Sequence, residues 1–138
     1  MKKNRRFFNG QTLVEFVLIL PLFLVLIIGF LDLGRAIFYY SALSNAVRES
    51  TRYAITQRNL SEDDIKDRVI DYAFTLQNTP NPLEREDIII SYPLVEDGIN
   101  MNISVKATYT FLPLTPFIAP NGIDLVAQST MRIAGAAR

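Results

Sequence analysis

Residues 13–31 read LVEFVLILPLFLVLIIGFL, a run of 19 residues in which Glu15 is the only charged side chain. A helix rises about 1.5 Å per residue and the hydrocarbon core of a bilayer is about 30 Å thick, so a helix of this length just spans a membrane. Pro21 and Gly29 would weaken a helix in water, but membrane helices tolerate both, and Pro21 predicts a bend. We therefore expect a transmembrane helix over about residues 13–31.

The flanks of this run indicate its orientation. Four basic residues and no acidic one precede it, namely Lys2, Lys3, Arg5 and Arg6. By the positive-inside rule, this predicts that the N-terminus is cytoplasmic and that the chain beyond the span lies outside. A cleaved secretory signal is the competing interpretation, but its apolar stretch is usually about 7–15 residues long and is followed by an A-x-A-like site. This run is longer, and the DLGRAIFYY that follows offers no such site.

Composition excludes several functional classes. The 138 residues include no Cys and no His, which removes disulfides, thiolate metal sites, cysteine nucleophiles and the commonest general base. No nucleophile elbow or Gly-rich phosphate loop is present, so we expect no enzyme, no cofactor and no small-molecule substrate. Without residues 1–10 the chain carries 10 basic and 14 acidic residues, which argues against nucleic acid as a partner.

A single helix is expected to run from near residue 12 to near residue 57, its lower part in lipid and its upper part packed on a small domain. No Gly or Pro interrupts the chain between Arg35 and Gln57. Apolar residues recur there at helical spacing, at Ala36, Tyr40, Leu43, Val47 and Ala54. The aromatic triplet at residues 38–40 suits either the belt at a membrane interface or packing within the domain, and the sequence leaves both open.

The remaining chain predicts an α+β head over residues 58–138. Ser61 followed by three acidic residues resembles a capping box, which starts a second helix that runs to about Gln77. After a Pro-rich breaker the period changes to two, with strands expected over residues 87–95, 101–111 and 123–133 and a hairpin turn at residues 96–98. Three antiparallel strands with one apolar face need a helix to cover that face, and the upper part of the long helix is available. The expected architecture is an α+β head on a helical stalk.

Two groups of charges are interpreted as ordinary surface features. Asp32 and Arg35 lie three residues apart on the long helix, so we expect an exposed ion pair worth a few tenths of a kcal/mol. Asp64, Asp67 and Asp71 could suggest a Ca²⁺ site, but the Gly-centred loop of such sites is missing, and a solvated helix face is the preferred interpretation.

The stretch from Asn9 to Ala54, NGQTLVEFVLILPLFLVLIIGFLDLGRAIFYYSALSNAVRESTRYA, resembles the TadE-like family of the tight adherence (Tad) pilus system, which comprises pseudopilins or minor pilins. The resemblance implies that residues 1–10 are a basic prepilin leader, which a membrane prepilin peptidase removes by cutting between Gly10 and Gln11. It also implies that Glu15, fifth in the mature chain, and the aromatic Phe16 act in subunit assembly. A glycine at the membrane edge independently suits a cleavage site, because it lets a protease approach the backbone closely.

Glu15 needs an explanation because a carboxylate within a membrane helix is costly, by about 2.5–3.5 kcal/mol at the centre and less near the end. In a bundle it could pair with the new α-amino group of a neighbouring subunit and set the axial register. Alternatively, it merely reaches the headgroups.

Together with the predicted span, the resemblance implies a single-pass protein of a bacterial cell membrane that serves in assembly of a Tad-type pilus for surface adhesion. The expected partners are the bilayer, a prepilin peptidase, other pilin or pseudopilin subunits and the Tad secretion machinery. The alternative function is an adhesive or ligand-binding module held outside the cell by an uncleaved helix.

Overall fold

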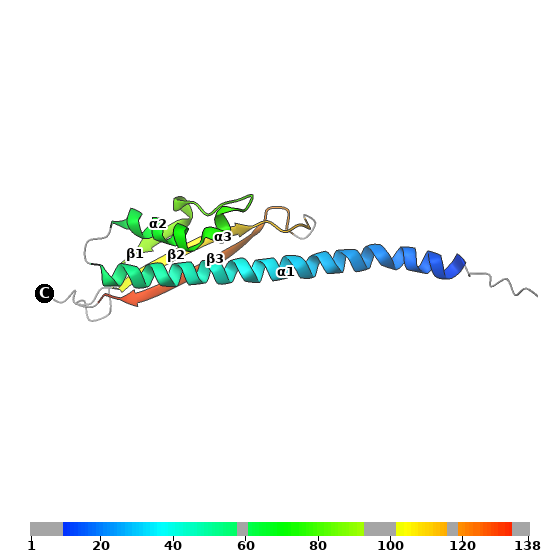
Figure 1. The fold of residues 1–138 in the computed structure, drawn as a ribbon, viewed down its shortest axis with the longest axis horizontal. Helices are drawn as coiled ribbons and strands as arrows, with labels where there is room; N and C mark the ends of the chain where they lie inside the picture. Colours follow the sequence, from blue (N-terminus) through cyan, green and yellow to red (C-terminus); the bar gives the residue numbers. More distant parts are fainter. Residues whose placement is uncertain (1–9, 58–60, 93–101, 116–118, 134–138) are drawn as a thin grey trace, which may run out of the picture.

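A computed structural model describes residues 10–57, 61–92, 102–115 and 119–133 of the chain. Its longest element is α1 (Gly10–Thr56), a helix of 47 residues. The other elements are α2 (Glu62–Tyr72), α3 (Phe74–Gln77), a 3-10 turn (Arg85–Asp87) and the strands β1 (Ile88–Ser91), β2 (Asn102–Phe111) and β3 (Ile123–Arg132). Figure 1 shows these elements packed along one half of α1, while the other half extends beyond them. The predicted α+β class is confirmed.

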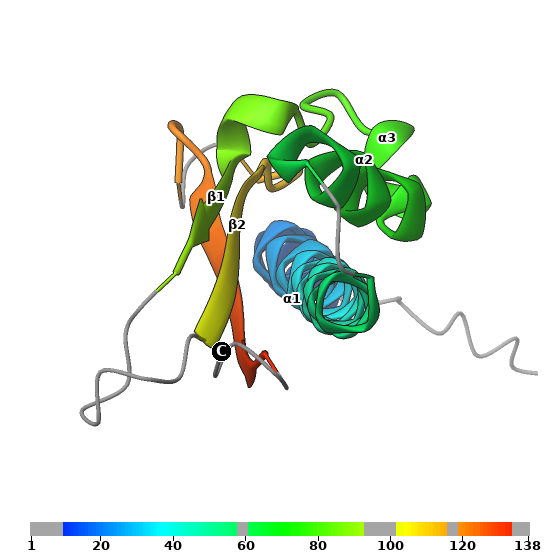
Figure 2. The same cartoon turned by 90° about the vertical axis from the view of Figure 1, so that its left-hand side faces the viewer.

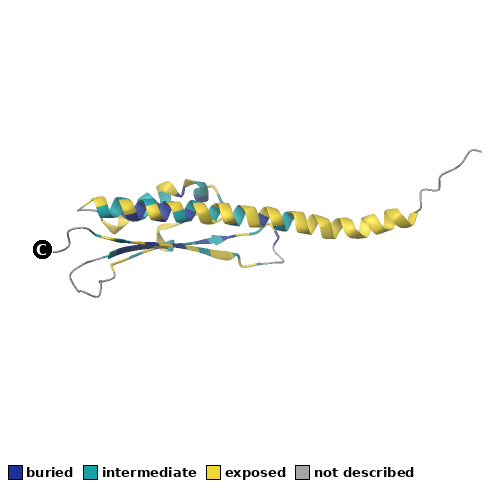
Figure 3. Ribbon diagram, turned by 90° about the horizontal axis from the view of Figure 1, so that it is seen from below, coloured by how far each residue is buried: buried dark blue, intermediate teal, exposed yellow. Residues whose placement is uncertain are grey.

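Burial divides α1 into two parts, which we call the lower half (residues 10–31) and the upper half (residues 32–56). All of its buried residues lie in the upper half, beginning with Asp32. In Figure 3 the lower half is almost entirely exposed, whereas the upper half alternates between exposed and buried positions. Pro21 lies inside α1 without ending it, and the helix curves gently (Figure 1).

The sheet is antiparallel with the order β1-β2-β3. Pairing of Phe111 with Ile123 and of Asn102 with Arg132 keeps β2 and β3 in register over ten residues. The alternation of residues gives one apolar and one polar face, as the period of two predicts. On the polar face the Ser104 hydroxyl accepts hydrogen bonds from Gln128 at 2.9 Å and Thr130 at 3.0 Å. The apolar face is therefore the one that needs cover.

The upper half of α1 provides that cover together with α2, which lies beside it (Figure 2). The fully buried residues come from the helices and from the sheet and include Leu43, Val47, Val69, Leu76, Val105 and Ala107. Each large apolar side chain that is fully buried contributes about 1.5–3 kcal/mol relative to exposure. The guanidinium of Arg68 also lies 4.4 Å from the ring centroid of Tyr53, a cation–π contact that joins α2 to α1.

The helix starts and turns largely follow the sequence, with one difference. The predicted capping box is present, since Ser61 accepts from the Asp64 N–H and the Asp64 carboxylate accepts from the Ser61 N–H. The predicted continuation of this helix to Gln77 is wrong at one residue. A tighter turn at Ala73, with Leu76 donating to the Ala73 carbonyl at 2.8 Å, separates α2 from α3 but still buries Leu76.

The first strand is shorter than predicted. The sequence predicts residues 87–95, and the described strand is Ile88–Ser91, with Tyr92 outside it. Residues 93–95, the predicted hairpin turn at residues 96–98 and residues 1–9 of the predicted basic leader lie outside the described residues. Before β3, Gly122 has a φ of +82°, and a Cβ there would come within 2.7 Å of Thr110 Cγ2. Only glycine fits this turn without strain.

Candidate functional site: the exposed half of α1 and its junction with the head

The lower half of α1 is apolar and uncovered. Its most apolar 18-residue window has a mean hydropathy of 2.9, and none of it is buried. A helix of this composition in the core of a water-soluble protein would be buried. Length and composition therefore make α1 a candidate membrane span, and the same helix continues without a break into the core of the head.

The four residues predicted for cleavage and assembly lie in the first two turns of α1. Gly10 is the first residue of the helix, so the bond between Gly10 and Gln11 belongs to its first turn. The side-chain amide of Gln11 donates a hydrogen bond of 3.2 Å to the Glu15 carboxylate, one turn further along. Phe16 is 62% exposed. Helical geometry thus places Gln11 and Glu15 on one face, and Phe16 on an adjacent one.

Asp32 lies at the boundary between the two halves and is 6% exposed. Its carboxylate accepts hydrogen bonds from the backbone N–H of Leu114 at 2.9 Å and of Thr115 at 3.1 Å, and from the Thr115 hydroxyl at 3.0 Å. Arg35 adds a fourth hydrogen bond, of 3.0 Å. We call Asp32, Arg35 and the segment Leu112–Thr115 the junction. The expectation of an exposed, weak Asp32–Arg35 pair is therefore wrong, because the head supplies three further donors to the carboxylate.

The junction keeps Asp32 ionised. Burial by itself raises the pKa of the Asp32 carboxyl, but the hydrogen bonds from Leu114, Thr115 and Arg35 outweigh it and hold the pKa below its ordinary value of 3.8. Asp32 is the first residue beyond the apolar run, so a charge is fixed at the end of the candidate span. Its hydrogen bonds tie the chain after β2 to α1 across more than 80 residues of sequence.

Aromatic rings extend the junction into the head. The Arg35 guanidinium lies 5.2 Å from the ring centroid of Phe111, and the Tyr39 ring makes edge contacts with Tyr109 and Phe111 at 5.8 and 5.9 Å. The predicted packing position Tyr40 is instead 47% exposed. The aromatic triplet is thus divided, with Tyr39 packed against the sheet and its two neighbours exposed.

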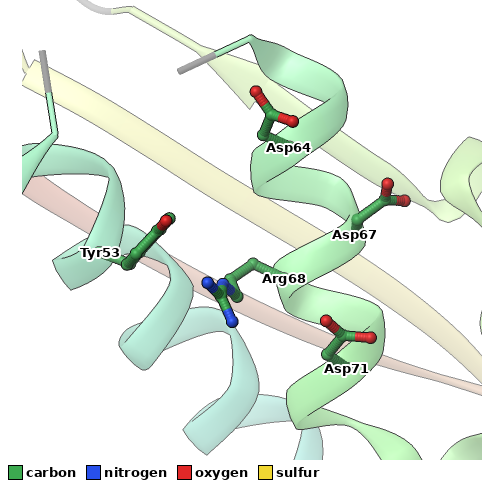
Figure 4. A pocket seen from close by; sticks show the side chains of 5 residues that line it. All are labelled: Tyr53, Asp64, Asp67, Arg68 and Asp71. Carbon is green, nitrogen blue, oxygen red and sulfur yellow. The ribbon is translucent and has the colours of Figure 1, made fainter. Parts of the chain in front are cut away.

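The acidic face of α2 does not gather into a metal site. Asp64 caps its own helix, Asp67 forms a two-pronged ion pair with Arg85 at 2.7 and 2.6 Å, and Asp71 is exposed. Figure 4 shows Arg68 extending toward Tyr53 of α1, and these two residues line one open pocket together with the three aspartates of α2. Within the described ranges, no group of three or more potential metal-binding side chains occurs.

Comparison with known families places these features in context. The family model described as TadE-like protein matches residues 10–52, which include the lower half of α1, Asp32 and Arg35. This segment is therefore similar to the TadE-like family. The match begins at Gly10, the first residue of α1, and ends near the C-terminus of the helix. No curated protein and no solved structure matches the chain.

The TadE-like match supports association of the chain with a Tad pilus and with a membrane. The matched residues all belong to α1, so the match does not include α2 or the strands. The four residues with predicted roles in cleavage and assembly lie within the matched segment, and those roles stay predictions. The sequence does not reveal that Asp32 is buried.

Proposed function

We propose that the chain is a minor pilin or pseudopilin that acts in the assembly of a Tad-type pilus for surface adhesion. The observation that carries the proposal is the TadE-like match to a helix whose lower half is apolar and unburied. Its partners are the bilayer, a prepilin peptidase, other pilin subunits and the Tad secretion machinery. It has a structural role and catalyses no reaction.

The design of α1 suits such a subunit. The upper half is part of the core of the head, and the lower half continues the same helix. A force on the lower half is therefore transmitted directly to the head. The lower half presents apolar side chains on all sides, which can face lipid or the helices of neighbouring subunits. Moving it from the bilayer into a fibre needs no refolding of the head.

Proteolytic maturation is the direct test of the proposal. The bond between Gly10 and Gln11 lies in the first turn of α1, where the N–H groups have no intrahelical partner. This turn can therefore unwind to enter the active site of a protease, and no core contact is lost, because the buried residues of α1 begin at Asp32. Protein isolated from its native membrane should begin at Gln11 when examined by N-terminal sequencing or intact mass. A Met1 terminus in cells with an active prepilin peptidase would contradict the proposal and favour the permanently anchored module.

Topology gives an independent test. By the positive-inside rule, the basic residues ahead of the span favour a cytoplasmic N-terminus, since Asp32 and Arg35 beyond the span cancel in charge. A reporter that is active only outside the cytoplasm, fused after Arg138, should therefore be active. The same fusion with a cytoplasmic reporter should be silent, and the reverse pattern would refute the orientation.

A further inference from the structure

We propose that the segment Leu112–Thr115 lies in the interfacial region of the bilayer, so that the head docks on the membrane surface through this segment. The inference rests on membrane anchoring by the lower half of α1 and not on a role in a pilus. It assigns a lipid surface as the partner of an exposed part of the head.

The depth of this segment follows from the Asp32 hydrogen bonds. A helix of residues 13–31 spans about 28 Å, close to the thickness of the hydrocarbon core, and the headgroup regions extend the bilayer to about 40–45 Å. Asp32 follows directly on this run, and its carboxylate holds the N–H groups of Leu114 and Thr115 at 2.9 and 3.1 Å. The segment is therefore fixed at the level of the headgroups. Figure 1 shows the chain after β2 at the end of the head nearest the lower half of α1.

The side chains at this level are apolar and exposed. Leu114 is 62% exposed and Leu112 is 40% exposed, although both belong to a folded head. The outer surface of α1 is similar at the same level and in the two turns beyond it, where Leu33, Ile37, Phe38 and Tyr40 are 47–58% exposed. No charged residue occurs from residue 36 to residue 47. Exposed aromatic residues at this depth are typical of a membrane interface.

Lipid fits this surface better than a second copy of the chain. The exposed apolar surface of α1 continues from the span to Tyr40. Lipid can therefore cover both the span and this surface beyond it. The charges at the same level, Asp32 and Arg35, are already satisfied within the junction and need no partner. Contact with another copy remains the alternative that the experiment must exclude.

The chain has no cysteine, so single cysteines can carry an environment-sensitive fluorophore. Leu114→Cys places the probe on the proposed surface. Ile89→Cys is the matched control, since Ile89 is an apolar residue of similar exposure, 57%, on the sheet. Leu22→Cys, at a residue 71% exposed in the lower half of α1, tests membrane anchoring itself. The full chain is reconstituted in phosphatidylcholine vesicles that contain a nitroxide-labelled lipid, and aqueous iodide serves as the opposing quencher.

The probe at position 114 should be quenched by the labelled lipid several-fold more than the probe at position 89, and it should be protected from iodide. This difference should not depend on the ratio of protein to lipid. Equal quenching at the two positions would overturn the proposal, and protection that grows with protein density would assign the surface to a second copy instead. An unquenched probe at position 22 would show that anchoring itself fails, which separates that failure from failure of the proposal.

Discussion

Replacement of Asp32 by alanine should destabilise the head by about 3 kcal/mol, because several buried donors lose their acceptor at once. The N–H groups of Leu114 and Thr115 and the Thr115 hydroxyl all bond to this one carboxylate. Arg35 would also keep its charge without its partner. For a domain of this size the change corresponds to a fall in Tm of roughly 10–20 °C. Circular dichroism of the full chain in detergent micelles would measure it.

A control variant and a double-mutant cycle make this result specific to the junction. Glu49→Ala removes an exposed carboxylate from the same helix, whose ion pair with Arg52 is 3.6 Å long, and it should change stability very little. Thr115→Val removes only the hydroxyl donor. Its effect should be clear in the original chain and much smaller when Asp32 is already alanine, because the two residues interact directly. Equal melting of Asp32→Ala and the original chain would show that the junction contributes nothing to stability.

The sequence predicts local features of this fold well, because they depend on neighbouring residues. The long helix, the Ser61 capping box and the alternation along β2 are all visible as short patterns, and the structure confirms each of them. The apolar face of the sheet also requires a covering helix, and α1 was the one available. In each case the period or the cap is set within one or two turns of chain.

The sequence does not distinguish two neighbouring positions that both fit the helical period of α1. Tyr39 lies four residues before Leu43 and Tyr40 lies three residues before it, and either spacing suits one helix face. Only the position of β2 decides that Tyr39 meets Tyr109 and Phe111 while Tyr40 stays exposed. This information is not contained in the sequence of α1.

Asp32 was missed because its partners lie more than 80 residues away and are mostly backbone N–H groups, which any sequence supplies. One signal was present. Asp32 lies eleven residues before Leu43, just over three full turns, so it shares the face of α1 that packs against the head. A charged residue on a packed face needs buried partners, and this rule would have favoured a buried role over an exposed pair.

The substitution Glu15→Ala should separate insertion and processing from assembly. It removes the only charge of the apolar run, so insertion into the bilayer should become easier. Gly10 and the residues before it are unchanged, so cleavage should continue, and the head should fold as before because all of the buried residues of α1 lie at Asp32 or beyond. What should be lost is the pairing of the carboxylate with the terminal amine of a neighbouring subunit.

In the structure the Glu15 carboxylate is bound only by the side chain of Gln11, at 3.2 Å, among the interactions described for the lower half of α1. A neutral amide does not neutralise the carboxylate. In a bundle of apolar helices the Glu15 charge would be costly without a cationic partner, so pairing with a terminal amine would favour assembly. We therefore expect normal amounts of mature membrane protein but strongly reduced piliation and recovery of partner pilins. Gln11→Ala is the control for the hydrogen bond, because it removes the amide and leaves the charge. Since Gln11 follows the predicted cleavage site, N-terminal sequencing must first show that this variant is cleaved, and the cleaved variant should assemble. Glu15→Gln keeps the size and polarity of the side chain without its charge and should fail as alanine does. Normal piliation with both Glu15 variants would show that Glu15 is only an interfacial residue.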